Sequence, residues 1–349
     1  MQAKEIGTSD EVIISCFTCD AVTQAILASG ATPVYVDIND DLTMRDDDVL
    51  SAITQFTKAV IMQDTFGRLG LKESTIHKIR QKNILLLEDY VLSVGSSKEN
   101  VMLGKFGDAA FWSLEVSKTV TIGWGGVLSI NDKHFNKLMK EHYKLLSRIS
   151  IFEDLRRFMQ TFFSLLMAKR AIPFGYILWY ALYGSRIFKK SSSNFNQRLM
   201  QKKIGKISRD FYYFMEPRLN FLFDQTQRNY EKFALKARNL DLEIPVIQRK
   251  NEYIVSPRFS LIVHSNQVQN ICEKGKLLGV EIGTWFDECP PSLGHKNSKI
   301  FSYANASKIS KTIVNFSCHW TLSENEIENI LSILEFISHN SFKERQNMS

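Results

Sequence analysis

Cysteine, proline and glycine are scarce in this sequence, which has 5, 7 and 17 of them among 349 residues. Five cysteines are few and odd in number for the disulfide framework of a secreted protein, so we expect reduced thiols and a cytoplasmic location. The first ten residues also lack the apolar core of a signal peptide. The low proline and glycine content excludes collagen-like and low-complexity chains, and no repeat of 20 to 50 residues is present. The composition therefore predicts a globular protein.

Long apolar runs are also missing. The most apolar stretch, residues 158–184, is divided by Lys169, Arg170 and Pro173 into pieces of 11 and 14 residues, each shorter than the roughly 20 that a membrane-spanning helix needs. Basic residues surround these pieces, so we predict an apolar and basic helical insertion over residues 158–190. Two interpretations remain open: a buried helical hairpin at a subunit or domain contact, or a peripheral element that rests in the inner face of a membrane.

Positive charge is concentrated in one segment. Residues 133–238 contain 22 Lys and Arg against 7 Asp and Glu, a local balance of +15 in a chain whose formal net charge is +7. Solvated helix faces explain such a segment, and so does a phosphate-bearing or membrane partner. Because the basic residues are mixed with large aliphatic ones, a membrane surface fits better than nucleic acid, and we expect no nucleic-acid binding.

Short apolar runs alternate with amphipathic stretches over the first 130 residues, a pattern typical of strands joined by crossover helices in a mostly parallel α/β sheet. Ligands of such sheets bind at the carboxyl ends of the strands. Four acidic side chains fall at those ends: Asp37, Asp64, Glu88 and Asp89. We expect strands at 11–15, 32–37, 58–62, 84–87 and 108–113, and helices at 21–29, 47–53 and 73–81.

The second half of the chain is more helical. One or two long helices are predicted over residues 196–240, and strands at 259–263, 280–284 and 313–316 follow, with a helix at 268–278. Ser323 and Glu326 have the spacing of a capping box and begin a final helix, whose polar tail after His339 is expected to fray. We therefore predict a large domain over residues 1–216 and a small α+β domain over residues 217–349.

Zinc-protease, Walker and dinucleotide-binding motifs are absent, whereas residues 85–126 combine features of another chemistry. A strand ends in Glu88 and Asp89, and Lys118 lies five residues after Ser113, before a glycine turn at 123–126. Schiff-base chemistry needs a desolvated lysine of this kind, and an acid on a neighbouring strand can hold the pyridine nitrogen of pyridoxal phosphate protonated. Surface salt bridging is the alternative explanation of these residues.

Six segments, in matching order and spacing, make the chain resemble the DegT/DnrJ/EryC1/StrS family of sugar aminotransferases. They are DEVIISCFTC (residues 10–19), GATPVYVDI (30–38), TFG (65–67), LLLED (85–89), GKFGDAAFWSLEVSK (104–118) and GWGG (123–126). Residues 310–327 are similar more loosely. The resemblance implies an α/β protein of pyridoxal-phosphate-dependent transferase fold type I, with a mostly parallel large domain.

The same resemblance implies roles for individual residues. Lys118 would bind pyridoxal 5'-phosphate covalently and act as the catalytic residue, Asp89 would contact the pyridine nitrogen, and Ser113 the phosphate. Asn196 and Arg198 lie roughly where the family places a segment that reaches the phosphate of the neighbouring subunit, which implies a homodimer.

Further positions depart from the family pattern. Cys19 replaces the aromatic residue that stacks on the cofactor ring, and Leu92 stands where relatives tend to carry His or Gln. Trp124 replaces a frequent acidic residue and would line the sugar pocket, and His295 would edge the substrate cleft. The His that often precedes TFG is Asp64 here. The N-terminal helix with which the family begins, and which cradles the cofactor phosphate, has no counterpart before residue 10.

The implied activity is transfer of an amino group, from glutamate, to a keto group of a nucleotide-linked sugar in polysaccharide or amino-sugar biosynthesis. The alternative is a truncated, catalytically inactive homologue that binds a partner or a membrane.

Overall fold

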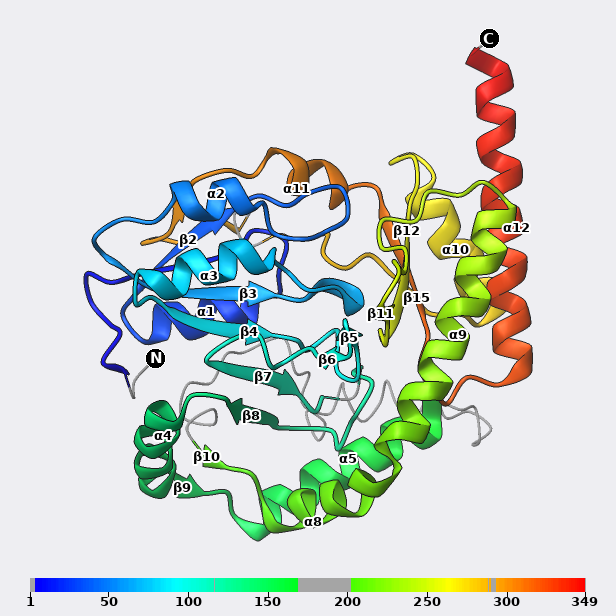
Figure 1. Cartoon of the computed structure of the whole chain (residues 1–349). Helices are drawn as coiled ribbons and strands as arrows, with labels where there is room; N and C mark the ends of the chain where they lie inside the picture. Colours follow the sequence, from blue (N-terminus) through cyan, green and yellow to red (C-terminus); the bar gives the residue numbers. More distant parts are fainter. Residues whose placement is uncertain (1–3, 116, 169–201, 288, 290–292, 349) are drawn as a thin grey trace.

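The computed structural model describes residues 4–115, 117–168, 202–287, 289 and 293–348 (Figure 1). Its centre is a seven-stranded sheet in the order β14-β2-β1-β3-β4-β7-β8. All neighbouring strands of this sheet run parallel except β7 and β8, which are antiparallel. The strands are β1 (Glu11–Ser15), β2 (Thr32–Val36), β3 (Thr57–Gln63), β4 (Leu85–Asp89), β7 (Ala109–Ser113), β8 (Gly126–Ile130) and β14 (Lys299–Ile300). The expected mostly parallel α/β sheet is confirmed.

Apolar side chains alternate between the two faces of this sheet. Ile13 of β1 packs on one face with residues of α2 (Asp46–Ser51) and α3 (Glu73–Gln81). Val12 and Ile14 lie on the other, with residues of α1 (Asp20–Ala28) and α4 (Lys133–Leu145). Because successive residues of a strand point to opposite faces, helices on both faces can cover the same buried strands.

A second sheet lies beside the first and is built from the C-terminal part of the chain (Figure 1). It has the order β12-β15-β13, with strands Arg258–Ile262, Ile313–Ser317 and Ile282–Gly283, all antiparallel. Helices α9 (Leu219–Asn239), α10 (Val268–Leu278) and α12 (Glu324–Met348) accompany it. Their apolar residues belong to the same cluster as one face of the large sheet. The two sheets therefore share a continuous core.

The C-terminal part also returns to the large sheet. Strand β14 forms its edge beside β2, and α11 (Ala304–Ile309) follows. Asp37, after β2, holds the beginning of α11, since its Oδ2 accepts the N–H of Asn305 at 2.7 Å and its Oδ1 that of Ala306 at 2.8 Å.

Two expectations for the C-terminal part are wrong in detail. The strand expected at 280–284 is reduced to β13, and the tail beyond His339 does not fray but continues α12 to Met348. The capping box is confirmed, because Ser323 N donates to Glu326 Oε2 at 2.8 Å and Glu326 N donates to Ser323 Oγ at 3.3 Å. The remaining short pairs are β5 (Ser97–Lys98) with β6 (Val101–Met102) and β11 (Glu252–Tyr253), and β9 (Ser147–Arg148) with β10 (Lys202–Lys203).

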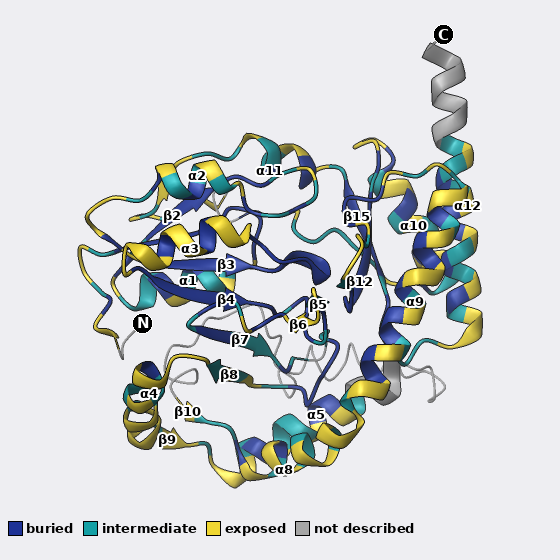
Figure 2. Cartoon of the chain, in the orientation of Figure 1, coloured by how far each residue is buried: buried dark blue, intermediate teal, exposed yellow. Residues whose placement is uncertain are grey.

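Helices α5 (Ile151–Ala168) and α8 (Lys206–Met215) pack on each other below the large sheet (Figures 1 and 2). Asp154 joins them, because its carboxylate accepts the N–H of Ile207 at 2.7 Å and the hydroxyl of Ser208 at 2.6 Å. Their outer faces are exposed and partly apolar: Ile151, Phe152, Leu155, Phe162, Tyr213 and Phe214. The predicted insertion at 158–190 begins in α5, and its residues 169–190 lie outside the described part.

Within the described residues, no helix has both the length and the apolar character needed to cross a bilayer.

Candidate active site

The carboxyl end of β4 provides the first group of the candidate site. Asp89 is the last residue of this strand and is buried. Its Oδ1 accepts the N–H of Val91 at 3.2 Å, and its backbone carbonyl accepts the N–H of Asp64 at 2.8 Å. Burial raises the pKa of Asp89 to about 6, against the opposing hydrogen bond and the charge of Lys118. A buried carboxyl of this kind favours a positively charged partner.

Lys118 lies in the loop that connects β7 and β8, and backbone hydrogen bonds fix this loop. Leu114 N donates to Gly125 O at 2.9 Å, Ile122 N donates to Leu114 O at 3.0 Å, and Lys118 N donates to Glu115 O at 3.1 Å. The loop also packs closely against α5: a side chain at Gly123 would not fit, since a Cβ there would lie 1.5 Å from the hydroxyl oxygen of Thr161. Lys118 therefore projects from a loop with a fixed backbone, at the same edge of the sheet as Asp89.

The electrostatic surroundings of Lys118 suit a nucleophilic amine. Burial lowers the pKa of its ammonium, and the positive charge of Arg258 acts in the same direction. Glu115, Cys19 and Asp89 oppose this shift. Since an amine must lose its proton to attack a carbonyl, a lowered pKa increases the reactive fraction at neutral pH.

Two side chains from the C-terminal part of the chain complete these surroundings, Arg258 at the start of β12 and Trp285 shortly after β13. The Nζ of Lys118 lies 4.6 Å from the ring centroid of Trp285, and the guanidinium carbon of Arg258 lies 4.6 Å from the same centroid. Beside Trp285, the ring of Phe286 meets Phe17 at 5.3 Å in an edge-to-face arrangement. Sequence reasoning missed both Trp285 and Arg258. The available signal was Arg258 itself, a charge at the start of the apolar strand RFSLI.

The structure brings Cys19, Asp89 and Lys118 together, since Cys19 and Asp89 both act electrostatically on the lysine. Cys19 stands at the beginning of α1. Ser113 ends β7, and its Oγ accepts the N–H of Glu115 at 3.2 Å, at the start of the lysine loop. Leu92 is buried in the apolar cluster that includes Phe17.

The other predicted residues lie further out. The ring of Trp124 contacts the guanidinium of Arg157 on α5, at 4.9 Å. His295 Nε2 lies 2.6 Å from Asp20 Oδ1, which places it beside the first turn of α1, next to Cys19. Asn196 and Arg198 lie outside the described residues.

The other acidic residues at strand ends have local structural partners. Glu88 accepts backbone N–H groups from Gly104, Phe106 and Gly107, the last two at 2.9 Å. Asp37 holds α11, as described above. Of the four strand-end acids singled out from the sequence, Asp89 is the one that acts on Lys118.

Asp64 is fully buried at the end of β3, where its Oδ1 accepts the N–H of Gly70 at 2.8 Å. Burial and the nearby carboxyl of Glu88 raise the pKa of Asp64 well above its usual range. At pH values between the pKa of Asp64 in the unfolded chain and its higher pKa in the folded protein, the folded protein binds more protons than the unfolded chain. Stability therefore falls as pH rises through this window.

We expect Asp64→Asn to stabilise the protein at pH 8, because the amide is neutral and its oxygen can still accept the N–H of Gly70. A gain of roughly 1 kcal/mol corresponds to a rise in melting temperature of about 2 to 4 °C. Thermal unfolding between pH 5 and 8 measures this, and the gain should shrink at the acidic end. Asp210→Asn, at an exposed ion pair with Arg209, is the control that should change little. A lower melting temperature for Asp64→Asn at pH 8 would contradict the argument.

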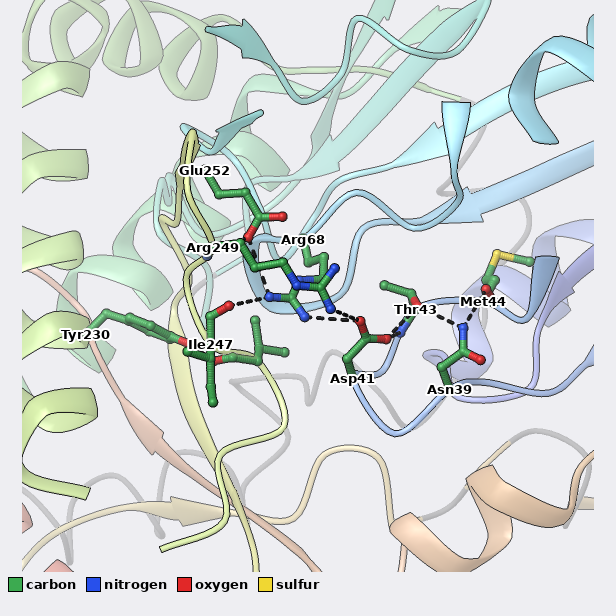
Figure 3. A network of polar contacts seen from close by, with 10 residues as sticks. Asn39, Asp41, Thr43, Met44, Arg68, Tyr230, Ile247, Arg249 and Glu252 are labelled. Carbon is green, nitrogen blue, oxygen red and sulfur yellow. Dashed lines mark hydrogen bonds and ion pairs between the residues drawn. The ribbon is translucent and has the colours of Figure 1, made fainter. Parts of the chain in front are cut away.

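A buried arginine connects the two parts of the chain near this edge (Figure 3). Arg68 follows the short turn Thr65–Gly67 and is 4% exposed; its Nη1 lies 3.1 Å from Asp41 Oδ2. Its Nη2 donates to the carbonyl of Ile247 and lies 3.5 Å from Glu252 Oε2, both in the segment between α9 and β12. The exposed Arg249 contacts the same oxygen of Asp41, at 2.8 Å. This network joins two loops of the large-sheet part of the chain to the segment that leads from α9 to β12.

Comparison with known proteins is consistent with this geometry. Residues 1–163 match the DegT/DnrJ/EryC1/StrS aminotransferase family. A dTDP-4-dehydro-2,3,6-trideoxy-D-glucose 4-aminotransferase of Saccharopolyspora spinosa is 32% identical over 159 residues, which are 45% of this chain and 41% of that protein. The GDP-perosamine synthase of Escherichia coli O157:H7 is 34% identical over 129 residues, 37% of this chain and 35% of that protein. The matched part thus spans less than half the length of these relatives.

The fold extends the likeness over the whole chain. The crystal structure of the aminotransferase TlmJ from Streptoalloteichus hindustanus superposes with a TM-score of 0.75 at 17% identity, covering 98% of this chain and 82% of that one. The expected fold, that of pyridoxal-phosphate-dependent transferases of fold type I, is confirmed.

Proposed function

We propose that this protein is a pyridoxal-phosphate-dependent aminotransferase, and the match of residues 1–163 to the DegT/DnrJ/EryC1/StrS aminotransferase family supports the proposal. The observation that carries the proposal is that the buried carboxyl of Asp89 acts electrostatically on Lys118, whose ammonium pKa is lowered by burial. The two groups come from different strand ends, so the fold brings them to one sheet edge.

The residues present fit the cofactor. Lys118 Nζ would be its point of attachment, and the carboxylate of Asp89 would hold a proton on the pyridine nitrogen. The hydroxyl of Ser113 would contact the phosphate, and Leu92 and Cys19 would lie against the ring. When bound, pyridoxal phosphate supplies an electron sink for the carbon that loses or gains the amino group.

The chain's own residues supply the acid and base. The amine of Lys118 would take the proton from the donor carbon that carries the amino group and would later supply a proton to the acceptor carbon that becomes aminated, and its lowered pKa favours the neutral form that the first of these roles needs. The ring of Trp285, from the loop after β13, lies beside this amine and would limit access of water. Asp89, with a pKa of about 6 in the free protein, is ionised at neutral pH and can accept the pyridinium hydrogen bond.

We further propose glutamate as the amino donor and a nucleotide-linked keto sugar as the acceptor, in polysaccharide or amino-sugar biosynthesis. The names of the two relatives given above, which include a dTDP-linked and a GDP-linked sugar, support the choice of acceptor. Trp124 and His295 would then contribute to the sugar side of the site.

A homodimer in the cytoplasm is the proposed assembly, with Asn196 and Arg198 reaching the partner's cofactor phosphate. The exposed apolar faces of α5 and α8 support a contact with a second chain, and the basic residues around them support peripheral membrane contact as the alternative. Sedimentation with and without anionic vesicles separates the two, because a dimer stays in solution whereas a membrane-bound protein moves with the vesicles.

The test is amino transfer itself. The purified chain with pyridoxal phosphate and glutamate should convert a 4-keto hexose linked to dTDP or GDP into an amino sugar, with one 2-oxoglutarate formed for each amino group transferred. Mass spectrometry of the sugar and an enzymatic assay of 2-oxoglutarate measure the two products. If no keto sugar of either class is aminated and glutamate gives no 2-oxoglutarate, the enzyme proposal fails and the non-catalytic homologue is favoured.

A further inference from the structure

A cavity outside the candidate active site lies between α9 and the segment that follows it. Its volume is about 580 Å³, within the range of roughly 300 to 1,000 Å³ that is common for small-molecule sites. Every residue that lines it belongs to α9 or to residues 244–250, so neither Lys118 nor Asp89 takes part. The cavity therefore offers a site separate from the one where an amino group would be transferred.

The two walls of this cavity are fixed to each other. Tyr230 of α9 is buried, and its hydroxyl donates to the carbonyl of Val246 in the other wall. Figure 3 shows that the next carbonyl, that of Ile247, accepts a hydrogen bond from Arg68. Because these bonds fix the walls before a ligand enters, binding would cost little conformational entropy in this segment.

Positive charge dominates the lining of the cavity. It has five basic side chains and one acidic one, a formal balance of +4. The basic residues are Arg228, Lys232, Arg238, Arg249 and Lys250, and the acidic one is Glu231. Arg249 Nη2 lies 2.8 Å from Asp41 Oδ2. Lys232 Nζ lies 3.8 Å from Oε2 of the exposed Glu324. The other three basic side chains form no ion pair with any residue that the structure describes, so they can bind an anion without breaking a contact.

The spacing along α9 suits a chain of phosphates better than a single phosphate. Arg228, Lys232, Leu235 and Arg238 follow one another at three or four positions and therefore share one side of the helix. The first and the last of them are about 15 Å apart along the helix axis. Leu235 is 57% exposed and Ile247, in the other wall, is 45% exposed. A matching ligand combines several negative charges with a flat apolar part.

We propose that this cavity binds a nucleoside triphosphate. Its phosphates would contact the guanidinium groups, whose planar N–H donors match phosphate oxygens, and its base would cover Leu235 and Ile247. A triphosphate chain carries about four negative charges near neutral pH, which balances the lining. Both phosphates of a nucleotide-linked sugar are esterified and carry about two, so that substrate matches the cavity less well. The proposal does not depend on the transfer reaction proposed above.

The test is isothermal titration calorimetry of the full chain with ATP, without divalent cations. We expect the wild type to bind ATP. The double variant Arg228→Gln and Arg238→Gln should raise the Kd at least about tenfold, as expected for lost charge-assisted hydrogen bonds. The double variant Lys78→Gln and Lys82→Gln is the matched control. It removes the same charge from exposed positions at the end of α3 and should leave the Kd nearly unchanged.

A second set of variants tests the nucleoside part. The double variant Leu235→Ser and Ile247→Ser should raise the Kd for ATP about tenfold, because it removes the apolar surface under the base. It should leave the Kd for tripolyphosphate, which has the charge but no base, unchanged. Leu277→Ser is the control, since Leu277 is 83% exposed on α10, and it should change neither Kd. The wild type should bind ATP more tightly than tripolyphosphate, and UDP-glucose should not displace ATP.

Five results would each overturn the proposal. The first three are no binding of ATP by the wild type, an unchanged Kd in the double arginine variant, and an equal loss in the double lysine control. Equal affinity for tripolyphosphate and ATP would indicate a site for a bare oligophosphate, and displacement of ATP by UDP-glucose would indicate the sugar-substrate site. Thermal unfolding checks that the variants fold, and we expect unchanged melting temperatures because the substituted side chains are exposed.

Discussion

In Lys118→Ala, amino transfer is expected to fall by about 10³-fold or more, because the variant loses both the covalent attachment point and the proton carrier of the site. A second readout does not depend on turnover. Borohydride reduction in the presence of pyridoxal phosphate should attach the cofactor to the peptide that contains Lys118 in the wild type, and mass spectrometry should find no such peptide in the variant.

Lys105→Ala provides the comparison for this experiment, since Lys105 is an exposed lysine shortly before β7. It should keep the label on Lys118 and the transfer rate of the wild type. Equal transfer by Lys118→Ala and the wild type would disprove the assignment of this lysine. Label spread over several exposed lysines, with none at Lys118, would show that the chain does not hold the cofactor at this sheet edge.

Arg68→Met is expected to give the largest loss of stability. The substitution leaves the carboxylates of Asp41 and Glu252 and the carbonyl of Ile247 without their buried cation. Removing one member of a buried ion pair costs about 3 to 5 kcal/mol, which corresponds to a fall in melting temperature of roughly 10 °C for a chain of this size. Differential scanning calorimetry and urea unfolding measure the two quantities.

Arg249→Met tests whether burial is responsible. Arg249 binds the same oxygen of Asp41 but is 62% exposed, so its loss should cost less than about 1 kcal/mol. Similar losses of unfolding free energy in Arg68→Met and Arg249→Met would mean that burial of Arg68 adds little to the stability of the network.

Although burial opposes it, hydrogen bonds from Thr43 and the charges of Arg68 and Arg249 lower the pKa of Asp41. The contribution of Asp41 should therefore be lost as pH falls through this lowered pKa.

The part of the site that depends on strand ends was predictable from the sequence. Asp89 and Lys118 follow apolar strands, and parallel strands end at one edge of a sheet, so their proximity follows from the alternation of apolar and polar segments. Local capping was not predictable in the same way. Asp37 and Glu88, like Asp89, are acidic residues at the end of an apolar strand. The three-dimensional structure is needed to see that Asp37 and Glu88 accept backbone N–H groups from segments elsewhere in the chain.

The contribution of the second sheet was also out of reach. Arg258 and Trp285 meet Lys118 because distant segments fold back over the first sheet, and no periodicity in the sequence reports on that approach. The domain division at residues 216 and 217 stays a prediction. Strand β14 and helix α11, which lie beyond that position in the sequence, accompany the large sheet.

The edge strand β14 makes the large sheet dependent on the end of the chain. Lys299 and Ile300 pair with Val34 and Tyr35 of β2, so a ribosome must synthesise most of the protein before this edge is covered. Until then β2 exposes unpaired backbone groups that can pair with another nascent chain. Contacts this distant in sequence also slow folding. Expression of an N-terminal fragment that lacks β14 should therefore favour aggregation. A chaperone should protect the chain most during the interval between synthesis of β2 and synthesis of β14, and slower synthesis lengthens that interval.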